Sequence, residues 1–149
     1  MKLNLAVAWL LCALPLMALA VDMSPPPSAE EDHLQSARSQ IAAGNWPAAI
    51  RELKRVNDTA NADWNNLMGY SHRRMAPPDY PGAERYYEQA LKIAPQHRGA
   101  LEYSGELYLM MGQLPRAEAR LQTLGEACAR QCEEYADLAK AVAADKTRN

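Results

Sequence analysis

A repeat of 34 residues places the strongest restriction on how this chain of 149 residues can fold. Three segments align at that distance: residues 44–50, 79–84 and 112–118. Five columns share the spacing: Ala49/Ala83/Ala117, Trp46/Tyr80/Leu114, Pro47/Pro81/Pro115, Leu53/Tyr87/Leu121 and Val56/Ala90/Leu124. A period of this length predicts stacked helix-turn-helix units and therefore an all-α fold.

Each column has a physical reason to exist. Residues four and seven positions after each alanine fall on the same stripe of a helix, as Leu53 and Val56 do after Ala49. The prolines fall in the first helical turn, where a missing N–H costs nothing. The helix before each of these segments carries its own stripe, which contains Trp64, Leu67, Met68, Ser71 and Met75 in one unit and Leu101, Ser104, Gly105 and Tyr108 in the next.

A column of small residues in these preceding helices shows where residues have been inserted into the repeat or deleted from it. Ala37, Gly69 and Gly105 are spaced by 32 and 36 residues rather than 34. We expect residues 76–78 to lengthen the turn of the second unit by two residues, and the linker after Val56 to be shortened by the same number.

These motifs are similar to the tetratricopeptide repeat, and residues 30–129 resemble three such units. The resemblance implies a right-handed α-solenoid of three helix-turn-helix units, at about residues 29–61, 62–96 and 97–130. It also implies a domain that binds peptides or proteins and has no catalytic activity. The first unit departs most from the family pattern, because His33 and Ser36 stand where such units favour large apolar residues.

The C-terminal segment predicts a seventh, capping helix at residues 131–146. Tyr135, Leu138, Ala139 and Val142 lie on one helical face. The end of a solenoid must be covered, because the last unit cannot bury its own apolar face. This helix and the three units form the domain at residues 29–149.

The first 20 residues predict a cleaved export signal, with 17 hydrophobic residues, Lys2 at the start and a small-x-small motif ending at Ala20. A Pro-rich tether at residues 21–28 follows, and Ser28 with Glu31 fits a capping box that would begin the first helix. We therefore expect a periplasmic or secreted protein. Its mature net charge of −3 argues against nucleic-acid binding and a polybasic membrane patch.

Cys128 and Cys132 are the two cysteines left after cleavage, and three roles are open to them. An exported protein favours a structural disulfide, which requires the helix to break between the two residues. A free or redox-active pair would suit an accessory factor in envelope redox or cofactor assembly. Metal or haem binding is a third role, although the spacing matches neither C-x-x-C-H nor C-x-x-C.

The predicted binding surface is a concave groove lined by the first helix of each unit. Leu34 and Ile41 are expected to line it in the first unit, and its candidate partner-binding residues are Arg38, Asn66, Tyr70, Arg73, Arg74, Glu102, Glu106, Leu109 and Met110. This set predicts a groove that is basic in the middle and acidic towards its C-terminal side, suited to a peptide of mixed charge. The alternative is that these residues form ordinary solvated faces.

No other pattern carries chemistry. We expect no catalytic residues, no cofactor and no metal site, and we take His33, His72 and His97 as surface or helix-end residues. Copper binding by the methionines is a weak alternative, because Met68, Met75, Met110 and Met111 have helical spacing. The leading hypothesis is a noncatalytic adaptor or scaffold of the cell envelope that docks a protein or peptide partner. Self-association is a further alternative.

Overall fold

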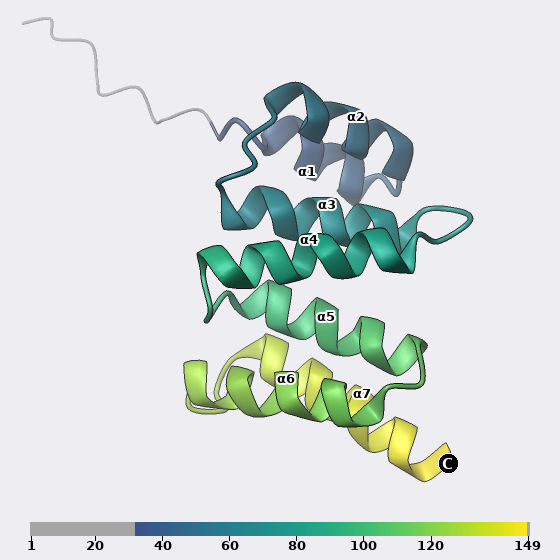
Figure 1. Ribbon diagram of the computed structural model, residues 1–149, viewed down its shortest axis with the longest axis vertical. Helices are drawn as coiled ribbons and strands as arrows, with labels where there is room; N and C mark the ends of the chain where they lie inside the picture. The colour runs from purple at the N-terminus through teal and green to yellow at the C-terminus, as the bar shows by residue number, and fades with distance from the viewer. Residues whose placement is uncertain (1–31, 149) are drawn as a thin grey trace, which may run out of the picture. The chain divides into compact units, whose positions relative to one another are not determined.

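A computed structural model describes residues 32–148, and this part of the chain contains seven α-helices and no strand (Figure 1). The helices are α1 (Gln35–Ala42), α2 (Trp46–Val56), α3 (Ala62–Arg74), α4 (Tyr80–Ile93), α5 (Arg98–Met110), α6 (Leu114–Ala127) and α7 (Glu133–Arg148). The expected signal, the tether and the Ser28–Glu31 capping box lie outside the described residues. Among the helices that are described, none is long and apolar enough to cross a membrane.

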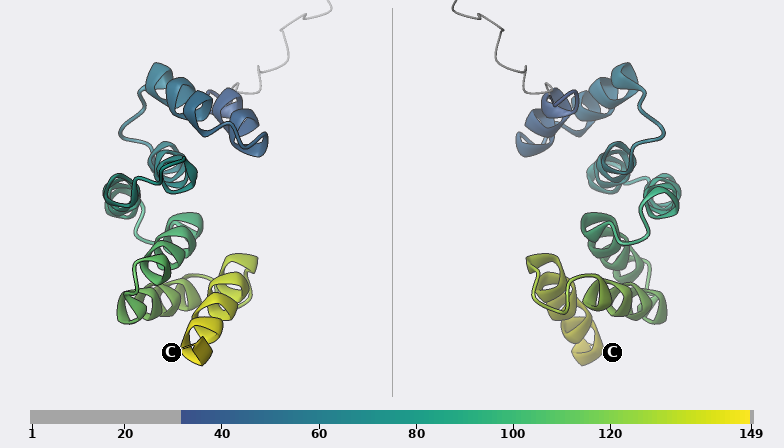
Figure 2. Two further views of the ribbon diagram at one scale, coloured as in Figure 1. Left: turned by 90° about the vertical axis from the view of Figure 1, so that its right-hand side faces the viewer. Right: turned by 90° about the vertical axis from the view of Figure 1, so that its left-hand side faces the viewer.

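The first six helices form three pairs, and successive pairs stack as the 34-residue period predicts (Figure 1). The first helices of successive pairs also touch along the stack, with α1 against α3 and α3 against α5. The additional helix α7 contacts α5 in the same way (Figure 2). The chain therefore folds as the predicted all-α solenoid of three units, and α7 follows the last unit as an additional helix.

Helix starts follow from side chains that satisfy free backbone N–H groups. The side chains of Asn61, Asp79 and His97 accept hydrogen bonds from the backbone at the beginning of α3, α4 and α5. The three repeat prolines lie in the first turns of α2, α4 and α6. Gly44 and Gly112 have φ of 69° and 70° in the short turns of the first and third units, a conformation that glycine adopts without strain.

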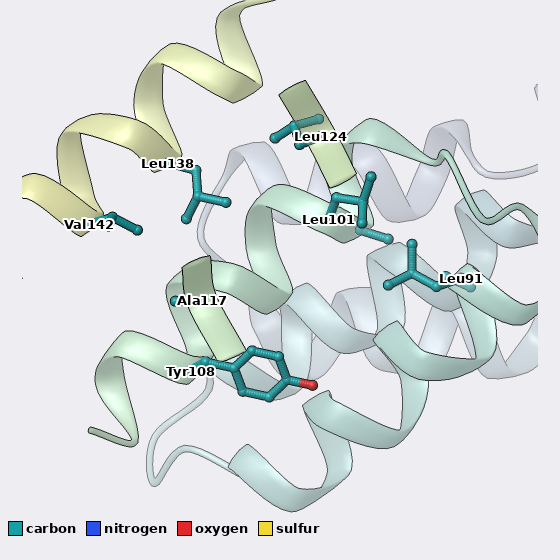
Figure 3. Packing of buried hydrophobic residues seen from close by; sticks show 9 residues of the cluster. Leu91, Leu101, Tyr108, Ala117, Leu124, Leu138 and Val142 are labelled. Atoms are coloured by element: carbon teal, nitrogen blue, oxygen red, sulfur yellow. The ribbon is translucent and has the colours of Figure 1, made fainter. Parts of the chain in front are cut away.

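The repeat columns form the core. The alanines Ala49, Ala83 and Ala117 are fully buried, as are Leu53 and Tyr87 four residues after the first two. In the C-terminal half, residues from α4, α5, α6 and α7 meet in one cluster (Figure 3). The labelled members are Leu91, Leu101, Tyr108, Ala117, Leu124, Leu138 and Val142.

One prediction for the first unit, the shortened linker after Val56, was wrong, and the predicted helix start at residues 28–31 lies outside the described residues. Helix α1 begins at Gln35, because Asp32 forms a turn in which its side chain accepts from Leu34 N and its carbonyl from Gln35 N. The deletion after Val56 shortens α2, which has 11 residues against 14 in α4, rather than the linker. The five-residue turn between α3 and α4 contains the expected insertion.

The chain leaves the helical conformation between the two cysteines, as a disulfide between them requires. Helix α6 ends at Ala127, and Ala129 and Arg130 have φ of 51° and 62°. Cys128 and Cys132 are joined by a disulfide, with their Cα atoms 5.8 Å apart. The left-handed residues therefore turn the chain sharply enough to bring the two sulfur atoms together.

Candidate functional site

A cleft of about 720 Å³ opens between α3, α5 and α7. Its walls are side chains from all three helices: Arg73, Arg74, Glu106, Leu109, Met110, Ala141, Ala144, Thr147 and Arg148. Helices α3 and α5 lie on the inner side of the stack, and α7 lies next to α5 (Figure 2). The cleft is therefore a concave surface between the second unit, the third unit and the final helix.

The structure brings five of the predicted groove residues together here, namely Arg73, Arg74, Glu106, Leu109 and Met110. Sequence reasoning missed the wall supplied by α7, because that helix was interpreted only as a cap. The sequence does contain a pattern that indicates this wall. Ala141, Ala144 and Arg148 are spaced by three and four residues, which places them on one stripe beside the buried stripe of Leu138 and Val142.

The remaining predicted groove residues lie elsewhere. Leu34 is buried in the N-terminal core, and Ile41 packs against that core. Arg38 forms ion pairs with Asp32 and Asp63, at 3.2 Å in each case. Asn66 and Glu102 are only 7% and 8% exposed and do not line the cleft. The groove is thus smaller than predicted and displaced towards the C-terminus.

Beside the cleft, three aromatic rings from three helices form a row. The Trp46 and Tyr70 ring centroids are 5.8 Å apart, and those of Tyr70 and Tyr103 are 4.8 Å apart. Two arginines pack on this row. The guanidinium carbon of Arg73 lies 5.3 Å from the Tyr70 centroid, and that of Arg74 lies 5.4 Å from the Trp46 centroid. These cation–π contacts hold both arginines against a rigid surface.

The charge pattern of the groove differs from the predicted basic middle and acidic end. Arg73 is buried and donates to Glu106 at 2.5 Å, so these two charges compensate each other. Arg74 is exposed and has no carboxylate partner among the described residues. The uncompensated charge at the middle of the groove is therefore that of Arg74.

Glu102 is buried on α5 and does not line the cleft. Burial, reinforced by the neighbouring carboxylates of Glu106, Asp137 and Glu134, raises the pKa of Glu102 to about 7. The only opposing influence is the positive charge of Arg73. This carboxyl group is therefore close to half protonated at neutral pH.

Each histidine pairs with one aspartate near a helix end, and no group of three or more potential ligands is placed to hold a metal ion within residues 32–148. The distances are 3.0 Å for His33–Asp58, 2.9 Å for His72–Asp79 and 2.8 Å for His97–Asp63. Asp63 also accepts from Arg38, so these ionic contacts connect the starts of α1, α3 and α5. Their geometry fits a structural role.

The repeat columns and the stacked helix pairs have counterparts in known proteins. Residues 75–142 match the family described as Tetratricopeptide repeat. This part of the chain is a tetratricopeptide-repeat region. The match runs from the turn before α4 through α4, α5 and α6 and into α7. No curated protein matches the sequence.

Among solved structures, the chain is similar to SycD, the type III secretion translocator chaperone of Yersinia enterocolitica. An alternative dimer of SycD has a TM-score of 0.69 at 20% identity, covering 79% of this chain and 92% of that chain. SycD in complex with a peptide of the translocator YopD has a TM-score of 0.68 at the same identity and coverage. At this identity the similarity establishes the fold.

Proposed function

We propose that this protein is a noncatalytic adaptor of the cell envelope that binds a protein or peptide segment in the cleft between α3, α5 and α7. The observation that carries this proposal is the cleft itself, in which exposed apolar side chains lie next to an uncompensated arginine. Met110 is 52% exposed, which makes it the more exposed of the two large hydrophobic residues on the surface of the described part of the chain; the other is Ile93, at 39%. An apolar side chain of that size in a concave surface favours a binding site.

The surroundings of the cleft suit binding rather than catalysis. The aromatic row fixes Arg73 and Arg74 before a ligand arrives, which reduces the entropy lost on binding. The cleft lining contains neither histidine nor cysteine, and its one carboxylate is paired with Arg73. The peptide-bound SycD structure shows that a protein of similar fold binds a peptide segment.

The envelope location rests on the N-terminal sequence. The apolar segment that ends at Ala20 has the features of an export signal, and we expect the mature chain to begin at Val21. The intact mass of the protein recovered from the periplasm or the medium tests this directly. A chain that keeps residues 1–20 and stays in the cytoplasm would contradict the location while leaving the binding site unaffected.

Site-specific photo-crosslinking tests the binding site. A photoreactive amino acid replaces Met110 in the cleft, and a matched control replaces Gln122, an exposed residue of α6 outside the cleft. We expect position 110 to yield a defined crosslinked partner in living cells, and position 122 to yield none. Introducing Tyr70→Ala with Arg74→Glu should abolish the crosslink while the far-UV circular dichroism stays unchanged. Equal crosslinking from both positions would overturn the assignment of the cleft.

A further inference from the structure

The cleft contains more positive than negative charge. Three of its lining side chains are arginines and one is a carboxylate. Arg73 and Glu106 compensate each other at 2.5 Å, and Arg148 has Asp145 within 3.2 Å. Arg74 is left without a carboxylate at its side. A ligand that brings a carboxylate to this position would supply the missing opposite charge.

Arg74 is also held where a ligand could reach it. Its guanidinium carbon lies 5.4 Å from the Trp46 centroid and 5.9 Å from the Tyr70 centroid, while the side chain remains exposed. An arginine packed on aromatic rings keeps its N–H donors free to form two parallel hydrogen bonds with a carboxylate. A lysine could occupy the same place but would not offer this paired geometry.

The floor and the far wall of the cleft are apolar. Leu109 and Met110 come from α5, and Ala141 and Ala144 come from the exposed side of α7. The small alanines leave room for an aliphatic side chain, and methionine adapts its shape to the group that it contacts. Arg148 lies beyond them in the last turn of α7, where it pairs with Asp145 at 3.2 Å.

We propose that the occupant of the cleft is a peptide segment in which an acidic residue lies beside aliphatic residues, and that α7 is a recognition element for it as well as a cap. This inference rests on the proposed binding function. The acidic side chain pairs with Arg74, and the aliphatic side chains pack between Met110 and the two alanines of α7. Because Arg74 and the acidic side chain carry opposite charges near the surface, association should weaken as salt is raised.

Selection from a phage-displayed library of short random peptides tests the inference without knowledge of the natural partner. The immobilised full-length mature protein should enrich sequences that combine Asp or Glu with Leu, Ile or Met. Selected peptides, made synthetically, should bind about tenfold more weakly to Arg74→Glu when measured by fluorescence anisotropy. Ala141→Arg, which places a bulky charge on the α7 wall, should weaken them to a similar extent.

The matched control is Arg51→Glu, which makes the same charge change at an exposed residue of α2 outside the cleft and should leave binding unchanged. Enriched peptides without an excess of acidic residues would overturn the inference but leave peptide binding intact. Equal binding by Arg74→Glu and wild type would overturn it as well. If no sequence is enriched, the proposed peptide binding fails, and the inference fails with it.

Discussion

The terminal helices at the two ends of the stack differ in length and in how much apolar surface they bury. At the N-terminal end, α1 has eight residues, of which only Ala37 is buried, and its outward side chains are mostly polar. At the C-terminal end, α7 has sixteen residues and inserts Leu138 and Val142 into the core formed by α4, α5 and α6 (Figure 3). A disulfide then fixes its connection to α6.

The difference arises from what each end would otherwise expose. The first unit uses polar residues such as Ser36 on its outer side, so it needs no further cover. The third unit presents Leu101, Tyr108 and Leu124, which require an added helix. The same helix also builds one wall of the cleft. At the C-terminal end, one helix therefore both covers the core and forms a wall of the cleft.

The largest expected effect comes from removing the main anchor of α7. Leu138→Ala should lower the free energy of unfolding by about 3 kcal/mol, because the leucine is fully buried and leaves a cavity. Urea denaturation followed by circular dichroism measures the change. Ile93→Ala, at a side chain that is 39% exposed, should cost about 0.5 kcal/mol. Similar losses for the two variants would show that α7 does not seal the core.

Removing the disulfide should have the next largest effect. Cys128→Ser with Cys132→Ser should cost about 2 kcal/mol, since the bond closes only a short loop in the unfolded chain. Reductant should destabilise the wild type to the same extent and leave the double variant unchanged. A wild type insensitive to reductant would contradict a structural bond. Loss of function in a stably folded double variant would instead favour the envelope redox hypothesis.

Gly69 and Gly105, from the small-residue column, allow the tightness of packing to be compared between the middle and the C-terminal end of the stack. A Cβ atom at position 69 would lie 2.7 Å from the Tyr87 ring, and one at position 105 would lie 2.6 Å from a terminal carbon of Leu138. Both side chains are buried, but the tyrosine presents a rigid ring, whereas the clashing atoms of Leu138 are the terminal methyl groups of a flexible side chain. Gly69→Ala should therefore cost about 1–2 kcal/mol. Gly105→Ala should stay within about 0.5 kcal/mol, because alanine also favours the helix.

Thermal melting of the two glycine variants under identical conditions gives the comparison directly. The expected order is a clear loss for Gly69→Ala and little change for Gly105→Ala. The reverse order would mean that the contact between α5 and α7 is the tighter of the two, and the C-terminal end would then be packed as rigidly as the middle.

The smallest effect concerns pH. The pKa of Glu102 is raised to about 7 in the folded protein against an unfolded value of 4.5, so the folded state binds more protons between these values. Stability therefore falls as pH rises through that window. Glu102→Gln should stabilise the protein by about 1 kcal/mol near pH 8 and by almost nothing near pH 5. Glu126→Gln, at an exposed site, should show no such dependence. An equal gain at both pH values would exclude a titration effect.

The sequence was sufficient to predict the three units, the core columns and the requirement for a break between the cysteines, because each depends on local periodicity. It was insufficient where the outcome depends on contacts between units. Arg73 and Glu106 neutralise each other across 33 residues, and no local pattern shows this pairing. The start of α1 at Gln35 depends on the turn made by Asp32, which helical periodicity does not show. The far wall of the cleft depends on how α7 docks.

The disulfide-bonded turn between α6 and α7 also affects whether α7 can be exchanged between two copies of the chain. If residues 128–132 continued α6 as one long helix, α7 would project outward and could complete the cleft of a neighbouring copy. The bond between the cysteines keeps this hinge closed, so α7 folds back on its own chain. Each molecule then carries a complete cleft of its own, so the proposed binding would not require exchange of α7 between copies.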